Sequence, residues 1–264
     1  FVEKQLIYSR IYRYLDRYKV QESNDEIVLS LNERVTMNCT IWVYWHQGIE
    51  NAPMLVKRCY DSICRNKPEN FDVVILSEKN LGEYIQLPDF IWEKYKEGYI
   101  TTTHLSDIIR LELLYAYGGC WVDSTVFCSD KIPAYMLHGE MFLFKLSGPE
   151  SSPVLKMSSW WLSANHGNRL IRLSRQMLLR YWEQETEIRS YFLLHIIMSK
   201  VIDEDSASRA IFSNSPFFSS GNAHVLQDKL GWEYNEDDWR VIKCASSVHK
   251  LTYKTRYIKG DLYN

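Results

Sequence analysis

The stretch THLSDIIRLELLYAYGGCWVDSTV, residues 103–126, contains the signals that decide the fold. Its apolar residues recur with the spacing of an amphipathic helix, which we expect over Thr101–Tyr117. A Gly-Gly pair then stops the helix, and a short strand is expected over Cys120–Val126, with its apolar run ending at Asp123. A carboxylate at the carboxyl end of a buried strand lies where open α/β sheets bind their ligands.

Asp123 is the first candidate for a chemical role. A carboxylate in this position can bind a hard divalent cation, which prefers oxygen ligands, or lie next to a diphosphate. Gly118 and Gly119 precede the strand and would leave room for a ligand to approach the turn. The alternative is that Asp123 only caps the turn that follows the strand.

Asp107 and Arg110 are the second candidate, because residues three apart share one face of a helix. That face also carries Leu111 and Leu114, so the pair is expected to be partly buried. A buried arginine needs a partner, and a network of substrate hydroxyls is one way to supply it. The alternative is an ordinary surface ion pair, with Ser106 or Asp107 as the N-cap of the helix.

The rest of the chain alternates strands and helices, which predicts right-handed βαβ units, a mostly parallel sheet and hence the α/β class. Runs of β-branched and aromatic residues predict strands at 40–45, 71–76, 141–146 and 241–244. Helices are expected at 53–64, 88–97, 168–183 and 190–202. We expect one large domain over residues 39–264, with a helical region at 168–203, preceded by a helix and connector over 1–38.

Residues 1–20 have the pattern of a helix with an aromatic and apolar face and a basic face, the latter carrying Lys4, Arg10, Arg13, Arg17 and Lys19. Such a helix can lie on an anionic membrane surface. The alternative is that it packs on the domain and leaves its charged face in water. The first interpretation predicts a cytoplasmic protein in peripheral contact with the inner face of the cell membrane.

Composition argues against several classes of protein. The 264 residues carry a formal net charge of −2, which argues against a generic nucleic-acid binder. The six cysteines show no Cys-x-x-Cys pair and no zinc-ligand spacing, so buried thiols in a reducing cytoplasm are expected. The sequence has no apolar run of about 18 residues, the length of a membrane span. Nine Trp, 18 Tyr and 10 Phe favour flat stacking contacts, although such rings also fill ordinary cores.

Late in the sequence, His249, Lys250 and Lys254 supply the positive charge that the first half of the candidate site lacks. The lysines could neutralise phosphate oxygens, and a neutral His249 could bind a metal ion. A lone histidine near a C-terminus is more often incidental, so its role depends on the neighbouring lysines.

The combination Ser-Asp-x-x-Arg followed by Gly-Gly-x-x-x-Asp, at 106–110 and 118–123, is more specific than a lone Asp-x-Asp. Together with IWVYWHQGIENAPMLVKRC, LPDFIWEKYKEG, the YWEQE and YFLLH segments and SSVHKLTYK, it covers the chain from Ile41 to about Tyr257. Over these residues the chain resembles the bacterial capsular polysaccharide synthesis glycosyltransferases. They are related to the Asp-x-Asp sugar transferases, which include the yeast initiating mannosyltransferase and the large clostridial glucosylating toxins.

The resemblance implies a GT-A fold and transfer of a sugar from a nucleotide donor with retention of the anomeric configuration. It implies catalytic roles for Asp107, Arg110 and Asp123. By matching positions, the other donor-binding residues would be Trp45 and Gln47 at the nucleotide, Trp121 at the ribose, Ser106 at the donor sugar, and His249, Lys250 and Lys254 at the diphosphate.

One departure from the family concerns the metal ion. The family often has Asp-x-Asp, whereas this chain has Asp123-Ser124-Thr125, and threonine is a poor metal ligand. We therefore expect a divalent cation, Mn²⁺ or Mg²⁺, to be weakly held by Asp123, with His249 and the diphosphate completing its coordination.

The resulting hypothesis is transfer of a hexose, with galactose or glucose favoured, from a UDP-sugar to an oligosaccharide linked to undecaprenyl diphosphate during synthesis of a capsular repeat unit. Glu185, Tyr191 and His195 in the helical region would shape the acceptor side, with core packing as the alternative. Two other functions stay open. One is a nucleotidyl or phosphoglycerol transferase that also uses Asp123 and a cation, and the other is a non-catalytic sugar-binding protein.

Overall fold

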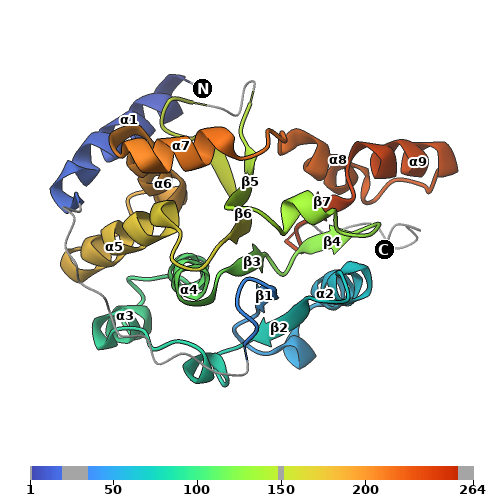
Figure 1. The fold of residues 1–264 in the computed structure, drawn as a ribbon, viewed down its shortest axis with the longest axis horizontal. Coiled ribbons are helices and arrows are strands. Elements are labelled where there is room, and N and C mark those ends of the chain that lie inside the picture. The colour runs from blue at the N-terminus through green and yellow to red at the C-terminus, as the bar shows by residue number, and fades with distance from the viewer. Residues whose placement is uncertain (1, 20–34, 148–151, 255–264) are drawn as a thin grey trace.

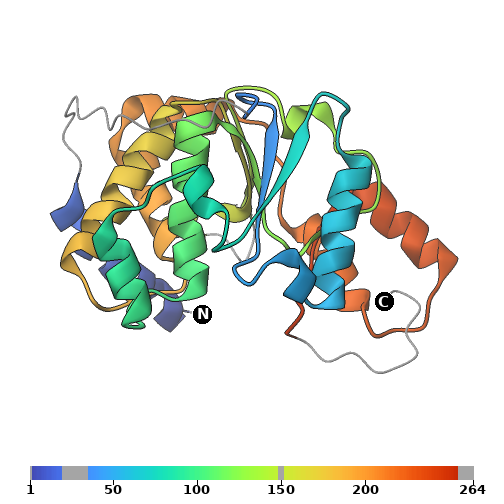
Figure 2. The same cartoon turned by 90° about the horizontal axis from the view of Figure 1, so that it is seen from below.

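A five-stranded sheet separates two groups of helices in a computed structural model that describes residues 2–19, 35–147 and 152–254 (Figures 1 and 2). The strands, in the spatial order of the sheet, are β2 (Asp72–Leu76), β1 (Thr40–Tyr44), β3 (Gly119–Val122), β6 (Met157–Ala164) and β5 (Met141–Lys145). β1 is parallel to β2 and β3, while β6 is antiparallel to both of its neighbours. Only β6 in this sheet therefore runs against the others, and the expected α/β class with a mostly parallel sheet is confirmed.

Strand β1, which lies between β2 and β3, is buried on both faces, as expected for parallel strands covered by helices. Ile41 and Val43 contribute to the apolar core on one face, and Trp42 and Tyr44 contribute to the core on the other. This alternation follows from the two-residue period of a strand.

The helices cover the two faces of the sheet unequally (Figure 2). On one side lie α1 (Val2–Tyr14), α3 (Asp89–Lys96), α4 (Thr102–Tyr117), α5 (Arg169–Gln184), α6 (Leu193–Glu204) and α7 (Ser206–Asn214). On the other side lie α2 (Met54–Asn66), α8 (Gly221–Lys229) and α9 (Glu236–Ala245). Short 3-10 turns occur at Leu15–Tyr18, Ile49–Asn51, Leu81–Glu83 and Ala134–Met136. The helices expected near 53–64, 88–97, 101–117, 168–183 and 190–202 are confirmed.

A separate two-stranded sheet joins β4 (Val126–Cys128) to β7 (Val248–Lys250). The two strands are antiparallel, and their register places Lys250 opposite Val126. The expected strand over Cys120–Val126 was too long, because β3 stops at Val122 and the chain turns, with the Val126 amide donating to the Asp123 carbonyl at 2.9 Å. The short sheet thereby brings a late segment of the chain to the carboxyl end of β3.

The start and end of α4 show why this helix is so well defined. Its N-cap is Thr101, whose hydroxyl accepts a hydrogen bond from the amide of His104, so the predicted N-cap at Ser106 or Asp107 was wrong. Gly118 ends the helix with a φ of 67°, and a Cβ at this position would lie 2.0 Å from an oxygen of Asn38.

The paired glycines do not make room for a ligand as expected. A Cβ on Gly119 would lie 2.2 Å from the carbonyl oxygen of Thr40 in the neighbouring strand. Both glycines lie at the amino end of β3, whereas Asp123 follows its carboxyl end. They are needed for the close approach of backbone segments.

The structure also differs from the expected strands at the segment 241–244 and at β6. The segment 241–244 was expected to be a strand, but it belongs to α9. Asn235 caps this helix by accepting hydrogen bonds from two backbone amides, and three acidic residues follow in the first turn, so the helix signal outweighs four β-prone residues. Strand β6 was not predicted at all.

The N-terminal helix α1 packs on the domain through Ile11, and the turn that follows it buries Leu15 and Tyr18. Leu6 and Ile7, one turn earlier, are 56% and 45% exposed. The predicted connector between this helix and the first strand lies mostly in 20–34, outside the described residues. Among the described residues, no helix is both long enough and apolar enough to cross a membrane.

Candidate functional site

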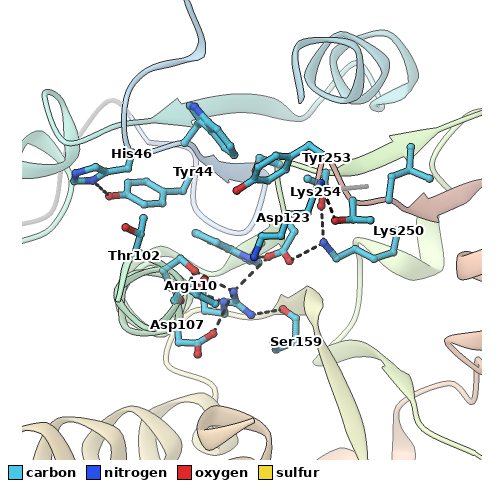
Figure 3. Close-up of a pocket in the computed structure, with 18 of the residues that line it drawn as sticks. Tyr44, His46, Thr102, Asp107, Arg110, Asp123, Ser159, Lys250, Tyr253 and Lys254 are labelled. Carbon is cyan, nitrogen blue, oxygen red and sulfur yellow. Dashed lines mark hydrogen bonds and ion pairs between the residues drawn. The ribbon is translucent and has the colours of Figure 1, made fainter. Parts of the chain in front are cut away.

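A pocket of about 590 Å³ lies beyond the carboxyl ends of β1 and β3 (Figure 3). Segments from distant parts of the chain form its wall: the end of β1, the first half of α4, the turn after β3, the start of α6, α8 and the segment after β7. The predicted residues that line it are Trp45, Gln47, Ser106, Asp107, Arg110, Trp121, Asp123, Tyr191, His195, Lys250 and Lys254. This is the edge of the sheet at which the sequence placed the site.

Arg110 links the predicted catalytic residues to each other (Figure 3). Its side chain is 4% exposed, and its Nη2 lies 3.2 Å from Asp107 Oδ1 and 3.3 Å from Asp123 Oδ1. Nη1 donates a hydrogen bond of 2.7 Å to the carbonyl oxygen of Ser159 in β6. The guanidinium also lies 5.0 Å from the ring centre of Trp121. The pair on α4 is therefore buried, and it is part of the site.

The two carboxylates have opposite electrostatic environments. Burial raises the pKa of Asp107 to about 7, although Arg110 acts against this shift. Burial would also raise the pKa of Asp123, but Lys250, Arg110 and a hydrogen bond from Trp121 hold it below its ordinary value. Asp123 thus stays ionised at neutral pH and Asp107 is close to its titration point.

We expect the pH dependence of stability to reveal Asp107. Between its ordinary pKa of 3.8 and about 7, the folded protein keeps a proton that the unfolded chain has released. The free energy of unfolding should therefore fall as pH rises through this window, by an amount on the order of 1 kcal/mol per pH unit at most. Urea unfolding of the protein and of Asp107→Asn at several pH values measures this fall, which the variant should lack. Parallel profiles for the two proteins would show that Asp107 has an ordinary pKa.

Lys250 is the second cation at Asp123. Its Nζ lies 3.3 Å from Asp123 Oδ2 and also donates a hydrogen bond to the hydroxyl of Thr125. Trp121 Nε1 donates to the other carboxylate oxygen at 2.9 Å. Both oxygens of Asp123 are thus engaged by side chains of the protein.

An aromatic wall borders the same pocket. Trp45 meets Tyr253 edge to face, with ring centres 5.4 Å apart, and the buried Nε1 of Trp45 has no hydrogen-bond acceptor among the described residues. The hydroxyl of Tyr44 forms a hydrogen bond of 2.7 Å with His46 Nδ1, and the hydroxyl of Tyr95 forms one of 3.1 Å with His46 Nε2. These contacts fix the end of β1 beside the pocket.

The predicted acceptor-side residues divide into two groups. Tyr191, 63% exposed, and His195 both line the pocket. Burial, with a contribution from Arg110, lowers the pKa of His195 to about 3, so its imidazole is neutral at physiological pH.

Glu185 does not line the pocket, so the structure does not bring it together with Tyr191 and His195. Its carboxylate accepts hydrogen bonds from the hydroxyls of Tyr14 and Tyr18 and pairs with Arg189 at 3.4 Å. Glu185 therefore ties the N-terminal helix to the loop between α5 and α6. That loop leads to Tyr191.

His249 is also turned away from the pocket. It precedes Lys250 in β7, so the two side chains point to opposite faces of the strand. His249 is fully buried, its Nε2 lies 2.8 Å from the Ser129 hydroxyl, and its ring lies next to Phe127 and Trp239. Burial lowers its pKa to about 4, which keeps it neutral. His249 and Asp123 therefore do not form the expected cation site.

The side chains at this pocket are a poor fit for a divalent cation. Such an ion takes several oxygen ligands, including carboxylates. Within the described ranges, no cluster of three or more His, Cys, Asp or Glu side chains could hold a metal ion. At the position equivalent to Asp-x-Asp, the only carboxylate is Asp123, which already contacts Arg110 and Lys250.

Several residues of the pocket were missed by the sequence reasoning. Tyr253 lies three residues after Lys250 in an aromatic and basic segment, a pattern that could have marked it as a stacking candidate. His224 and Gln227 come from α8, a helix that was not predicted. Ser159 contributes its backbone carbonyl, for which the side chain gives no signal.

Several known proteins are similar to this chain. The O-glycosyltransferase braB of Annulohypoxylon truncatum is 26% identical over 190 residues, which is 65% of this chain and 44% of that protein. The glycosyltransferase afumC of Aspergillus fumigatus is 27% identical over 240 residues, 79% of this chain and 61% of that protein. The chain thus spans about half the length of these curated relatives. The solved structure of the PaToxG glycosyltransferase aligns over 90% of both chains, with a TM-score of 0.44 and 12% identity.

The family comparison covers nearly the whole sequence. The model of the capsular polysaccharide synthesis protein family matches residues 2–263. The chain belongs to the capsular polysaccharide synthesis protein family.

Proposed function

We propose that the protein is a retaining glycosyltransferase that uses a nucleotide-sugar donor. One observation carries this proposal: an ionised carboxylate, Asp123, lies between Arg110 and Lys250 at the carboxyl end of a buried strand, beside an aromatic wall. The names of the curated relatives, which are glycosyltransferases, agree with it.

The charges of the pocket suit a nucleoside diphosphate as the leaving group. Arg110, Lys250 and Lys254 line the pocket, against the two carboxylates Asp107 and Asp123. Cationic donors at this position stabilise the negative charge that develops on the diphosphate as its bond to the sugar breaks. The flat rings of Trp45 and Tyr253 offer the base of the nucleotide an aromatic surface. A UDP-hexose, with galactose or glucose favoured, is our proposed donor.

Retention of configuration is supported by the poor bases around the pocket. Asp123 is held ionised by two cations, and the pKa of His195 is about 3. Asp107 has a pKa of about 7, but its side chain is 7% exposed and is paired with Arg110. A good general base would have a pKa near the working pH and a free lone pair. The departing phosphate can instead take the proton of the acceptor hydroxyl, if that hydroxyl attacks from the face that the phosphate leaves.

For the acceptor we propose a lipid-linked oligosaccharide that contacts Tyr191 and His195. The exposed Leu6 and Ile7, next to exposed basic residues of α1, would dock the protein on the inner face of the cell membrane. Liposome flotation of Leu6→Ser/Ile7→Ser tests this docking, and binding equal to that of the unchanged protein would refute it.

The N-terminal helix should also affect the acceptor side. In Tyr14→Phe/Tyr18→Phe, Glu185 loses both hydroxyl donors, so the loop that leads to Tyr191 is held less firmly. We expect the KM for a lipid-linked oligosaccharide acceptor to rise severalfold, while hydrolysis of the donor in water stays unchanged. Tyr12→Phe is the matched control, because Tyr12 donates to Asp203 and makes no bond to this loop. An equal effect in both variants would indicate general loosening of α1.

A panel of nucleotide sugars tests the proposed function. Purified protein is incubated with UDP-, GDP- and CMP-sugars and, separately, with nucleoside triphosphates, with and without acceptor, and the released product is identified. Release of UDP from UDP-galactose or UDP-glucose supports the proposal. Release of pyrophosphate from a nucleoside triphosphate would instead indicate a nucleotidyl transferase, and release of nothing from any donor would indicate a sugar-binding protein.

A further inference from the structure

We propose that the ammonium of Lys250 takes the place of a divalent cation at this site. The inference rests on the proposed function, since it concerns how the diphosphate of the donor is bound. Its basis is the position of one atom, Lys250 Nζ, between the side chains of Asp123 and Thr125. These are the first and third positions of the segment that corresponds to Asp-x-Asp.

Lys250 Nζ contacts the side chains at the first and third positions of the segment that corresponds to Asp-x-Asp. It lies 3.3 Å from Asp123 Oδ2 (Figure 3). It also donates a hydrogen bond to the hydroxyl of Thr125. An ammonium has three N–H donors, so two are used by the protein and one is left for a phosphate oxygen. A lysine in this geometry neutralises the carboxylate and still binds the ligand.

The backbone fixes this arrangement. Lys250 lies opposite Val126 in the β4–β7 sheet, and the amide of Leu251 donates to the carbonyl of Thr125 at 2.9 Å. The base of the lysine side chain is therefore held next to the turn that carries Asp123. Its side chain is only 21% exposed.

The same contacts exclude tight binding of a divalent cation. A cation at Asp123 would lie close to both Nζ of Lys250 and the guanidinium of Arg110, each about 3.3 Å from the carboxylate. Repulsion between like charges at such distances is strong in a partly buried site. Thr125 in addition offers a neutral hydroxyl where a carboxylate would attract the ion.

Binding of UDP with and without a metal ion is the first test. We expect the affinity for UDP, measured by calorimetry, to change less than about twofold between about 1 mM EDTA and about 1 mM Mn²⁺. In electron paramagnetic resonance, the signal of free Mn²⁺ should be as large with protein and UDP as with UDP alone. Tightening by about tenfold or more with Mn²⁺, together with a free-ion signal smaller than that of Mn²⁺ and UDP without protein, would overturn the proposal.

The second test uses substitutions at Lys250 and Thr125 to make UDP binding depend on a metal ion. Lys250→Ser should weaken UDP binding about tenfold to a hundredfold, the usual cost of losing a charged hydrogen bond, and Mn²⁺ should not restore it. In Thr125→Asp/Lys250→Ser two carboxylates replace one, so Mn²⁺ should restore binding. Lys79→Ser is the matched control, because Lys79 is 82% exposed and lies outside the pocket. If Lys250→Ser bound UDP as tightly as the control, the lysine would not hold the diphosphate.

These experiments separate failure of the inference from failure of the proposed function. Tight UDP binding that requires Mn²⁺ in the unchanged protein would refute the inference and leave a metal-dependent glycosyltransferase. Absence of binding of UDP, GDP and CMP under all conditions would refute both.

Discussion

Asp123→Asn is expected to lower the rate of sugar transfer by at least about a hundredfold while the protein stays folded. The carboxylate holds Lys250 with one oxygen, and with the other it holds Arg110 and accepts from Trp121. An amide keeps the shape but is neutral and has one acceptor oxygen. Arg110 and Lys250 would then lose the carboxylate that orients them toward the proposed position of the diphosphate.

The measurement is the rate of UDP release from the best donor of the panel, with folding followed by circular dichroism. Asp61→Asn is a suitable control, because Asp61 is exposed on α2 and does not line this pocket. Full activity of Asp123→Asn would remove Asp123 from the mechanism. Loss of activity together with loss of the folded signal would make Asp123 a structural residue.

Arg110→Ala is expected to have the largest effect on stability. The guanidinium is 4% exposed and is the partner of two carboxylates, so its removal leaves Asp107 buried and unpaired. Breaking a buried ion pair from one side costs about 3–5 kcal/mol, which corresponds to a fall in Tm of about 10 °C for a chain of this length. Transfer should also be lost, since Arg110 lines the pocket.

A second variant shows whether the unpaired carboxylate is the cause. Asp107→Asn/Arg110→Ala also replaces the buried carboxyl, which without Arg110 must keep a proton to stay buried, and should recover part of the lost Tm. Arg58→Ala is the control for the loss of an arginine, because Arg58 is exposed and forms no ion pair with the described residues. If the double variant melted no higher than Arg110→Ala, the loss would come from packing or from the hydrogen bond to Ser159.

The parts of the fold that the sequence revealed are those with local signals. Helix α4 has a regular apolar spacing and a glycine at its end, and β1 is a compact β-branched and aromatic run. Strand β6 was missed because its sequence, MSSWWLSA, mixes serine with tryptophan and shows no alternation. All its residues are buried, so no solvent-facing positions impose a period of two.

The site was predictable where the residues are close in sequence and less so where they come from distant segments. Asp107, Arg110 and Asp123 were found together because α4 and β3 are adjacent. Lys250 and His249 were both proposed for the diphosphate, but only the register of β7 decides which one faces the pocket. Glu185 does not line the pocket, and its partners, Tyr14 and Tyr18, come from the start of the chain, which its local sequence does not reveal.

The short β4–β7 sheet has a consequence for how the protein is made on the ribosome. Lys250 is 125 residues beyond Thr125, its hydrogen-bond partner, so a nascent chain completes all five strands of the main sheet long before this lysine is synthesised. Such a chain can bury most of its apolar surface and still lack the cation beside Asp123. Newly made molecules should therefore acquire catalytic competence late, in a final docking step that follows folding of the main sheet.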